Sequence, residues 1–437
     1  MSVIKSQHSG LMVAQPLPVI GVTLLVITGI GLSSCSSLPT PELPPAQPSQ
    51  CPSWSAGQTV EVTENITLPS GCHYNKVSFV IQRSNITFDC NNALLNGSGF
   101  TNKNADLIPY TASTVPANLA FNITAQEGKP IDNITIRNCQ IKNYIDGVRV
   151  KSVLSNATIN RLKTATDGFA IEEGLRQTAP QNIQLQNLRI SDSHKHGIYL
   201  DRYVHHVTIE NGAITNAGNS AIYLESGTKN ITIRHMTLEH NGYSSYDRDK
   251  SLSLPRLGDT RREAIAVDSS ADNQIIGNTF RNNGAGGVFL YKNCYEKHTE
   301  APQMPRLQHS DHNTIADNQF IDESTGVWLA SRQSRDLASF NCGDPLVHSD
   351  YLQKFYADHA EYNTVSGNAF TNVALGVNVE DDNNQVVNNR FTGNSKTDIQ
   401  IGSRIRSLLN NPVKSVNLIM GNHHQSSSVP PVVLLNN

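Results

Sequence analysis

Acidic side chains recur at one place in a short pattern that the sequence repeats. The pattern is a small residue followed by alternating apolar and other residues, and its fifth position is Glu172, Asp201, Glu225 or Asp268 in four successive copies. Alternate side chains of a strand point to opposite faces, so these acids would all point away from the core. Carboxylates stacked at the ~4.8 Å spacing of neighbouring strands repel one another. A divalent cation between them, or one carboxyl that keeps its proton, would relieve the repulsion.

These acids define a predicted metal site. We expect Asp201, Glu225 and Asp268 to bind a cation, and Ca²⁺ is the candidate because it takes carboxylate oxygens as ligands. One of the carboxyls could instead act as a general acid. The alternative without chemistry is that acidic side chains only keep a sheet face soluble and hinder edge pairing.

Aromatic side chains take the third position of the same pattern and should lie beside the acids. They are Tyr199, Tyr223, Phe289 and Trp328. Flat ring faces suit the C–H groups of sugars, so we predict that these four residues bind a polysaccharide.

Basic side chains lie close to the same strands. Histidines cluster around Asp201, and His196 could act as a general base because its ordinary pKa is near neutrality. Arg202, Lys292 and Arg332 come directly after copies of the pattern and could stabilise negative charge on a substrate. We predict catalytic roles for these four residues. The alternative is that turn histidines only complete hydrogen bonds.

A repeat positions all of these residues. A five-residue spacing of two polar turn residues around β-branched or apolar residues occurs nine times, with asparagine at the first position in eight copies and at the second in seven. The copies start at Asn133, Asn156, Asn182, His206, Asn230, Asn273, Asn313, Asn363 and Asn384. Five of the eight intervals between starts are 21 to 26 residues long. The small-residue pattern lies between these copies, at Gly147, Gly168, Gly197, Ala221, Ala264, Gly287, Gly326 and Gly376.

This repeat predicts an all-β fold, a parallel β-helix (solenoid) with about 23 residues per coil. The period is too short for a propeller blade, and the leucine spacing of leucine-rich repeats is absent. We expect one such domain over 51–437, with an N-terminal cap and a C-terminal tail. Asparagines at one turn position of successive coils should form a hydrogen-bonded ladder. The members we expect are Asn273, Asn313, Asn363 and Asn384.

The two motifs resemble the right-handed parallel β-helix repeats of the pectate-lyase-like superfamily, over roughly residues 78–404. The resemblance implies one of that superfamily's usual activities: polysaccharide lyase, uronan 5-epimerase or galacturonan-type hydrolase. Fold alone does not choose among them.

Three coils carry long insertions, at about 241–262, 294–311 and 332–362. The first precedes a small-residue strand, and the other two follow such strands on successive coils. Because neighbouring coils stack, we expect the insertions to lie close together and to carry function. A disulfide between Cys294 and Cys342 would then join the second insertion to the third. The alternative is that these loops lengthened without a function.

A lyase or 5-epimerase acting on an acidic, uronate-containing polysaccharide fits the predicted parts best. Both reactions begin when a base removes the proton beside a uronate carboxylate while a cation stabilises the developing charge. One alternative is a non-catalytic protein that binds a glycan or assists exopolysaccharide assembly. Another is a hydrolase of the polygalacturonase type, since Thr166-Asp167-Gly168 and His196-Gly197 resemble pieces of that family's motifs. Its adjacent Asp-Asp and its Arg-x-Lys are not at the expected places.

The N-terminal segment is expected to direct the chain to a membrane. Residues 19–32 are apolar and lead into Leu32-Ser33-Ser34-Cys35, which resembles the lipobox of bacterial lipoproteins. The resemblance implies a signal peptide over 1–34 and a lipidated Cys35, followed by a proline-rich tether over 35–50. The serine after Cys35 favours the outer membrane within a bacterial cell envelope. An ordinary secretory signal or a short membrane helix is the alternative.

Composition restricts the partners. Charged residues make up 16% of the chain and the net charge is -3, with no basic block, which argues against nucleic acid as a partner. The 45 asparagines and 29 glycines favour a turn-rich β architecture. Six cysteines remain besides Cys35, an even number that suggests disulfides in an exported chain, and none forms a C-x-x-C pair. We expect a monomer.

Overall fold

The computed structural model describes residues 50–97, 119–164, 168–243, 261–293, 306–330, 346–347, 355–356, 358–408, 411–414, 416–425 and 428–435. All of them belong to one compact unit, 50–437. Cys35, Arg332 and the pair Cys294 and Cys342 lie outside the described residues. No helix in the described part of the chain is long and apolar enough to cross a membrane.

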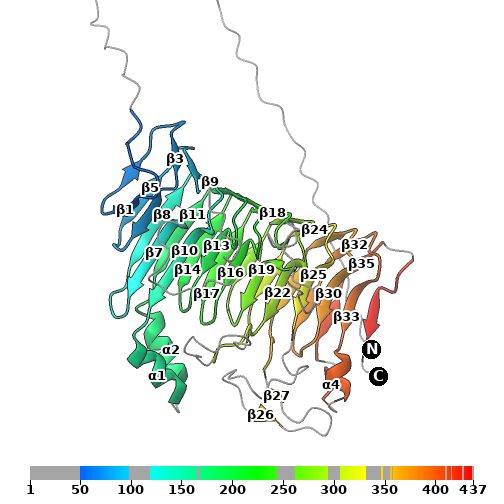
Figure 1. Ribbon diagram of the computed structural model, residues 1–437. Coiled ribbons are helices and arrows are strands. Elements are labelled where there is room, and N and C mark those ends of the chain that lie inside the picture. Colours follow the sequence, from blue (N-terminus) through cyan, green and yellow to red (C-terminus); the bar gives the residue numbers. More distant parts are fainter. Residues whose placement is uncertain are drawn as a thin grey trace, which may run out of the picture. The chain divides into compact units, whose positions relative to one another are not determined.

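Three long parallel sheets, here named A, B and C, make up this unit, and the chain visits them in turn (Figure 1). Sheet A consists of β1 (Thr59–Val62), β4 (Ser78–Ile81), β7 (Leu119–Gln126), β10 (Asp146–Val153), β13 (Ile198–Leu200), β16 (Ile222–Leu224), β19 (Glu263–Asp268), β22 (Gly286–Tyr291), β25 (Thr325–Leu329), β30 (Leu375–Val379), β33 (Thr397–Ile401) and β36 (Val432–Leu434). Each strand pairs with the strand one coil away, which is the architecture of a parallel β-helix and confirms the predicted fold class.

Sheets B and C complete each coil. Sheet B consists of β2 (Ile66–Thr67), β5 (Ile86–Asp89), β8 (Asp132–Arg137), β11 (Gln181–Gln186), β14 (His205–Glu210), β17 (Lys229–Arg234), β20 (Gln274–Ile276), β23 (Thr314–Ala316), β28 (Thr364–Ser366), β31 (Gln385–Val387) and β34 (Leu418–Met420). Sheet C consists of β3 (His73–Asn75), β6 (Leu94–Asn96), β9 (Gln140–Lys142), β12 (Arg189–Ser191), β15 (Ala213–Thr215), β18 (Thr237–Glu239), β21 (Thr279–Arg281), β24 (Gln319–Ile321), β29 (Ala369–Thr371), β32 (Arg390–Thr392) and β35 (His423–His424). The turns between sheets are called the AB, BC and CA corners below. A small antiparallel pair, β26 (Leu346–Val347) and β27 (Phe355–Tyr356), lies in the chain after β25.

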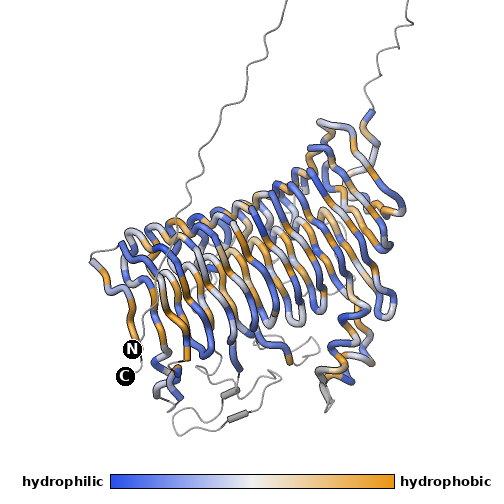
Figure 2. Tube along the Cα trace, turned by 180° about the vertical axis from the view of Figure 1, so that it is seen from behind, coloured by the Kyte–Doolittle hydropathy of each residue, from blue (hydrophilic) through white to orange (hydrophobic). Residues whose placement is uncertain are grey.

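Alternation along the strands builds the core. Ile198 and Leu200 are fully buried, as are Ile222 and Leu224 one coil further on, so the apolar second and fourth positions of the small-residue pattern point inward. Apolar and polar residues alternate along the coils in Figure 2. On the inner side of sheet C, four phenylalanines stack at ring distances of 4.7–4.8 Å: Phe280, Phe320, Phe370 and Phe391. Because every coil repeats the same inward positions, the core is continuous along the solenoid.

The five-residue spacing of the asparagines comes from the corners. Asn133, Asn138 and Asn143 have φ angles of 54°, 56° and 59°, one at each successive corner of a coil. Asparagine tolerates this left-handed conformation better than most residues. From Asn273 onward the repeated asparagine lies one position later, beyond Asp272, which takes the left-handed conformation in its place (φ 55°). The single sequence motif therefore covers two structural positions.

The asparagines at the later position form the predicted ladder at the AB corner. The Asn273 side-chain amide donates to Asn313 Oδ1 at 2.7 Å, that of Asn313 donates to Asn363 Oδ1 at 3.0 Å, and that of Asn363 donates to Asn384 Oδ1 at 3.1 Å. Each oxygen also accepts a backbone N–H from the preceding coil, for example Asn313 N to Asn363 Oδ1 at 2.9 Å. All four side chains are buried, so the ladder satisfies polar groups that water does not reach.

Two predicted repeat copies are wrong. The segments beginning at Asn156 and Gly168 are not a coil: they form helices α1 (Asn156–Thr164) and α2 (Gly168–Arg176) at an AB corner. Strand β10 pairs directly with β13, so no sheet A strand exists between them, and Glu172 leaves the predicted acidic column. Ser155 Oγ accepts the N–H of Thr158 and caps α1, while a small separate core forms around Leu162, Leu175, Ala179 and Tyr203. Capping and packing favour the helix here, and α4 (Arg404–Leu408) lies at a later AB corner.

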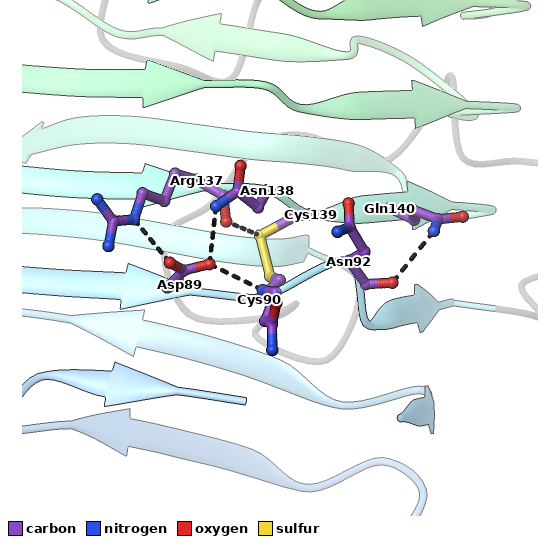
Figure 3. Close-up of a disulfide and its surroundings, with 8 residues drawn as sticks. Asp89, Cys90, Asn92, Arg137, Asn138, Cys139 and Gln140 are labelled. Carbon is purple, nitrogen blue, oxygen red and sulfur yellow. Dashed lines mark hydrogen bonds and ion pairs between the residues drawn. A yellow bond between two sulfur atoms is a disulfide. The ribbon is translucent and has the colours of Figure 1, made fainter. Parts of the chain in front are cut away.

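Two disulfides lie near the N-terminal end, and the second of them joins neighbouring coils. Cys51 is bonded to Cys72, and Cys90 is bonded to Cys139 (Figure 3). Cys90 and Cys139 come directly after β5 and β8, at the BC corner. Later coils place ladder asparagines such as Asn278 and Asn318 at this corner. A covalent link therefore stands where later coils use amide hydrogen bonds.

Candidate functional site

Sheet A carries a polar cluster on its outward face, built by the third and fifth positions of the small-residue pattern. Tyr199 Oη donates to Glu225 Oε2 at 2.7 Å, and Tyr223 Oη donates to Asp268 Oδ2 at 2.6 Å. The two tyrosine rings stack at 5.1 Å and 11°. Each tyrosine therefore holds the acid of the following coil. Burial and the neighbouring carboxylate raise the pKa of both phenols well above 10, so both stay protonated and act as hydrogen-bond donors.

Arg306, the first described residue after the second insertion, lies against both acids. Its Nη1 contacts Glu225 Oε1 and is 3.1 Å from Asp268 Oδ2. Burial opposes ionisation of Glu225, but the charges of Arg306 and Arg202 outweigh burial and lower its pKa to about 2. Burial raises the pKa of Asp268 to about 6 although Arg306 is close. Glu225 and Asp268 therefore lose their protons at different pH values. The guanidinium of Arg306 contacts two of the three acids that the sequence predicts to bind a metal ion.

His196 belongs to a second group on the same face. Its Nδ1 is 3.0 Å from Asp146 Oδ1, and its ring lies 4.9 Å from that of Tyr199. Arg149 Nη1 is 3.6 Å from the other oxygen of Asp146, and Arg149 Nη2 is 3.2 Å from Asp201 Oδ2. Burial lowers the pKa of His196, so the imidazole is neutral at pH 7. With Nδ1 hydrogen-bonded to Asp146, the basic lone pair is on Nε2.

The predicted site residues divide between this face and the AB corner. The sheet A face brings together Tyr199, Tyr223, Asp201, Glu225, Asp268 and His196, and the backbone N–H of Arg202 donates to Asp201 Oδ1 at 2.9 Å. Phe289 and Trp328 pack edge to face at 5.3 Å on later coils. Lys292 Nζ is buried 3.7 Å from Asp358 at the AB corner, and its charge acts on Glu172 together with that of Arg202.

Comparison with known proteins identifies the family. Residues 79–251 and 173–413 match the family model described as right handed beta helix region. The chain belongs to this right-handed β-helix family. No curated protein sequence matches the chain significantly.

Solved structures align with the chain at low sequence identity, and only the first of those described here reaches a TM-score of 0.50. A variant of the periplasmic alginate epimerase AlgG aligns with a TM-score of 0.50 at 12% identity, over 87% of this chain and 77% of that one. The catalytic domain of a GH87 α-1,3-glucanase in complex with tetrasaccharides has a TM-score of 0.41 at 11% identity, over 88% and 62% of the two chains. The tailspike protein of E. coli bacteriophage HK620 has a TM-score of 0.46 at 12% identity, over 85% and 58%. At these identities the likeness concerns the fold.

Three residues of this site are not among the predicted ones: Asp146, Arg149 and Arg306. Asp146 and His196 each precede the small residue of a pattern copy, but the predicted coil at Gly168 would have separated them, and only the direct pairing of β10 with β13 makes their coils adjacent. Arg149 holds the third position that Tyr199 holds one coil later, and the two pair in register. Arg306 belongs to the second insertion, which the sequence predicts to lie near this face, but no pattern singles out Arg306 as the residue that contacts Glu225 and Asp268.

A second acidic group lies far along the β-helix. Glu361, Asp381 and Asp382 are the one set of at least three possible metal ligands within the described ranges. Arg406 contacts Asp381 Oδ1 at 2.9 Å and Asp382 Oδ2 at 3.3 Å, and backbone N–H groups of Ala360 and Asp382 donate to Asp381. These acids already have partners from the chain.

Proposed function

We propose that this β-helix protein acts on an acidic, uronate-containing polysaccharide as a lyase or 5-epimerase, with the sheet A face as its active site. The observation that carries the proposal is the shared contact of His196 and Arg149 with Asp146, at 3.0 and 3.6 Å. A base and a cation therefore lie side by side, as removal of a proton beside a carboxylate requires.

The reaction would use these residues as follows. His196 Nε2 takes the C5 proton of a uronate, and the C–H electron pair moves onto the carboxylate, where Arg149 stabilises the charge. Asp146 orients the imidazole and stabilises its protonated form. In an epimerase, C5 takes a proton from the opposite face; in a lyase, the bond to the O4 leaving group breaks instead. The proton added to C5 or to the O4 leaving group comes from solvent water, while Tyr199, whose ring lies beside His196, keeps its phenolic proton in the hydrogen bond to Glu225.

The test uses alginate first, because the fold is shared with an alginate epimerase, and then polygalacturonate. Incubation in D2O should place deuterium at C5 if the protein is an epimerase, and ultraviolet absorbance should rise if it is a lyase. His196→Gln should lower either signal by about 100-fold, the scale of general-base catalysis.

A matched variant controls for the loss of a histidine. His73→Gln replaces an exposed histidine on β3 and should leave turnover unchanged. Turnover by His196→Gln equal to that of the unmodified protein would contradict the proposal.

A second function is favoured by a separate observation. Arg306 contacts both Glu225 and Asp268, the charges around Glu225 lower its pKa, and burial raises the pKa of Asp268, so the two carboxyls differ in the same direction as the ionised carboxylate and the acid of a glycoside hydrolase. Hydrolysis would produce new reducing ends without ultraviolet absorbance, and Asp268→Asn would abolish them.

The proposal includes a location. A lipid on Cys35 would hold the protein at a bacterial outer membrane, where an exported polysaccharide passes. If the protein binds acidic glycans and transforms none of them, the same face serves binding or assembly, which is the non-catalytic alternative.

A further inference from the structure

A hollow on the outward face of sheet C has no part in the proposed chemistry. Its volume is about 550 Å³, and its floor and walls come from four adjacent strands, β6, β9, β12 and β15, with the residues before β15. It exists because Ala213 is small where the same column has Arg189 on one side and Thr237 on the other. The lining residues are Leu94, Gln140, Ile141, Lys142, Arg189, Ile190, Ser191, Asn211, Gly212, Ala213 and Thr215.

All charged side chains that line this hollow are positive. Lys142 and Arg189 are its two cations, and none of its lining residues is acidic. Register places Arg189 beside Gln140 and Lys142 beside Ser191, so the two cations lie diagonally on β9 and β12. No ion pair joins either of them to an acid in the described part of the chain, whereas Arg281 on the same sheet lies 3.9 Å from Glu239 and from Asp322.

Hydroxyl and amide groups surround the two cations. Ser191 and Thr215 lie side by side in register and half-buried, and Gln140 is exposed at the edge of the hollow. Two unpaired cations at diagonal spacing fit one carboxylate or sulfate group, and the hydroxyls fit the remaining oxygens of a sugar. The dimensions suit one or two sugar rings, since small-ligand sites have volumes of about 300–1,000 Å³.

The hollow shares its coils with the candidate active site. Strand β9 leads into β10, which carries Asp146 and Arg149, and β12 leads through His196 into β13. The hollow and the site thus lie on either side of one CA corner. A polymer held at the hollow would have a raised local concentration at the site, which a short oligosaccharide would not gain.

We infer that the sheet C hollow is a second binding site for an anionic sugar unit of the same polysaccharide, and that it holds long chains near the sheet A face. The inference rests on the proposed function for its choice of ligand. Its residues are Lys142 and Arg189, assisted by Ser191 and Thr215. It predicts a preference for acidic polymers over acidic oligosaccharides, and no binding of neutral polymers.

Affinity electrophoresis in gels containing alginate, polygalacturonate or dextran tests the site. The full chain should be retarded by an acidic polymer and not by dextran. Lys142→Gln with Arg189→Gln should weaken this retardation by about tenfold, as expected when two exposed charge contacts are lost.

A matched control separates a site from general charge. Arg390 is exposed and lies on β32 in the same column as Arg189. Arg390→Gln should change retardation much less than Arg189→Gln. Equal effects of these two variants, or an unchanged Lys142→Gln/Arg189→Gln protein, would overturn the inference.

The outcomes distinguish the two proposals. If the protein turns over an acidic glycan but the Lys142 and Arg189 changes do not alter its retardation, the second binding site is refuted and the proposed function stands. Retardation that depends on the hollow, without turnover of any glycan, refutes the reaction and supports the second site. An unmodified chain that no acidic polymer retards overturns the hollow outright.

Discussion

Arg306, a residue outside the repeat, changes the surroundings of two acids that the repeat aligns. The repeat aligns Glu225 and Asp268, and their repulsion suggests an external cation, yet a guanidinium of the chain itself lies between them. Both acids and Arg306 are buried, so each charge depends on the others. Removing one member leaves an uncompensated charge in a medium of low dielectric constant.

At the residue scale, Arg306→Met should therefore lower the free energy of unfolding by about 3–5 kcal/mol, the cost of breaking a buried ion pair. Glu225→Gln with Asp268→Asn should also be destabilising, because it leaves Arg306 buried without a counter-charge. Combining all three changes should cost less than the sum of the two separate losses. Urea unfolding of the three proteins measures this, and strict additivity would show that the charges do not depend on one another.

At the scale of an element, ladders of asparagine side chains satisfy buried polar groups at the corners of the coils. Asn313 gives its side-chain amide to Asn363 and accepts two bonds from Asn273, so one side chain satisfies polar groups on three coils. Asn313→Leu should lower the free energy of unfolding by about 1–3 kcal/mol, because buried donors lose their acceptor. Thermal unfolding checks this against Asn75→Leu, which removes only an exposed hydrogen bond. A midpoint equal to that of the control would contradict the ladder argument.

Glu323 replaces asparagine in the ladder at the CA corner. Its carboxyl accepts the backbone N–H and the side-chain amide of Asn283, and burial raises its pKa to about 8. The folded chain thus keeps a proton that the unfolded chain releases near pH 4.5. Between these values the contribution of Glu323 to the free energy of unfolding falls as pH rises, by a few kcal/mol at most, since one pKa unit corresponds to ~1.4 kcal/mol.

Glu323→Asn should abolish that fall. At other rungs one asparagine oxygen accepts both bonds, as Asn318 does from Asn278, and no charge is buried. Unfolding measured at pH 4.5 and pH 7 should show the variant gaining more stability at pH 7. Asp322→Asn is the control, because it removes a half-exposed carboxylate from the adjacent position. The same gain at both pH values would mean that Glu323 does not keep its proton.

Attachment to a membrane concerns the whole molecule. If Cys35 is lipidated, Cys35→Ala should move the protein from the membrane fraction to the soluble fraction after expression in a bacterial host, since acyl chains provide the anchor. The β-helix begins beyond the tether, so its thermal midpoint should not change. Fractionation with immunoblotting measures the first and thermal unfolding the second. A Cys35→Ala chain that stays membrane-bound and uncleaved would contradict the lipobox interpretation.

The β-helix itself was predictable because its determinants are local and repeated. The period near 23 residues fixed the coil, and alternation fixed Ile198 and Leu200 as inward and Tyr199 and Asp201 as outward. Registered stacking then placed Tyr199 beside Tyr223. Each of these facts depends on backbone geometry that the chain repeats, so a pattern of residue types is sufficient to find them.

Tertiary structure decided what the outward residues face. The segments at Asn156 and Gly168 satisfy the repeat pattern, yet their capping and their separate core make them helices, which removes Glu172 from the acidic column. Outward side chains such as Asp268 are buried because a residue 38 positions later, Arg306, folds back over them. Such a contact joins a repeat to a non-repeating segment, and its energy depends on burial and on charges from distant parts of the chain, which no local pattern encodes.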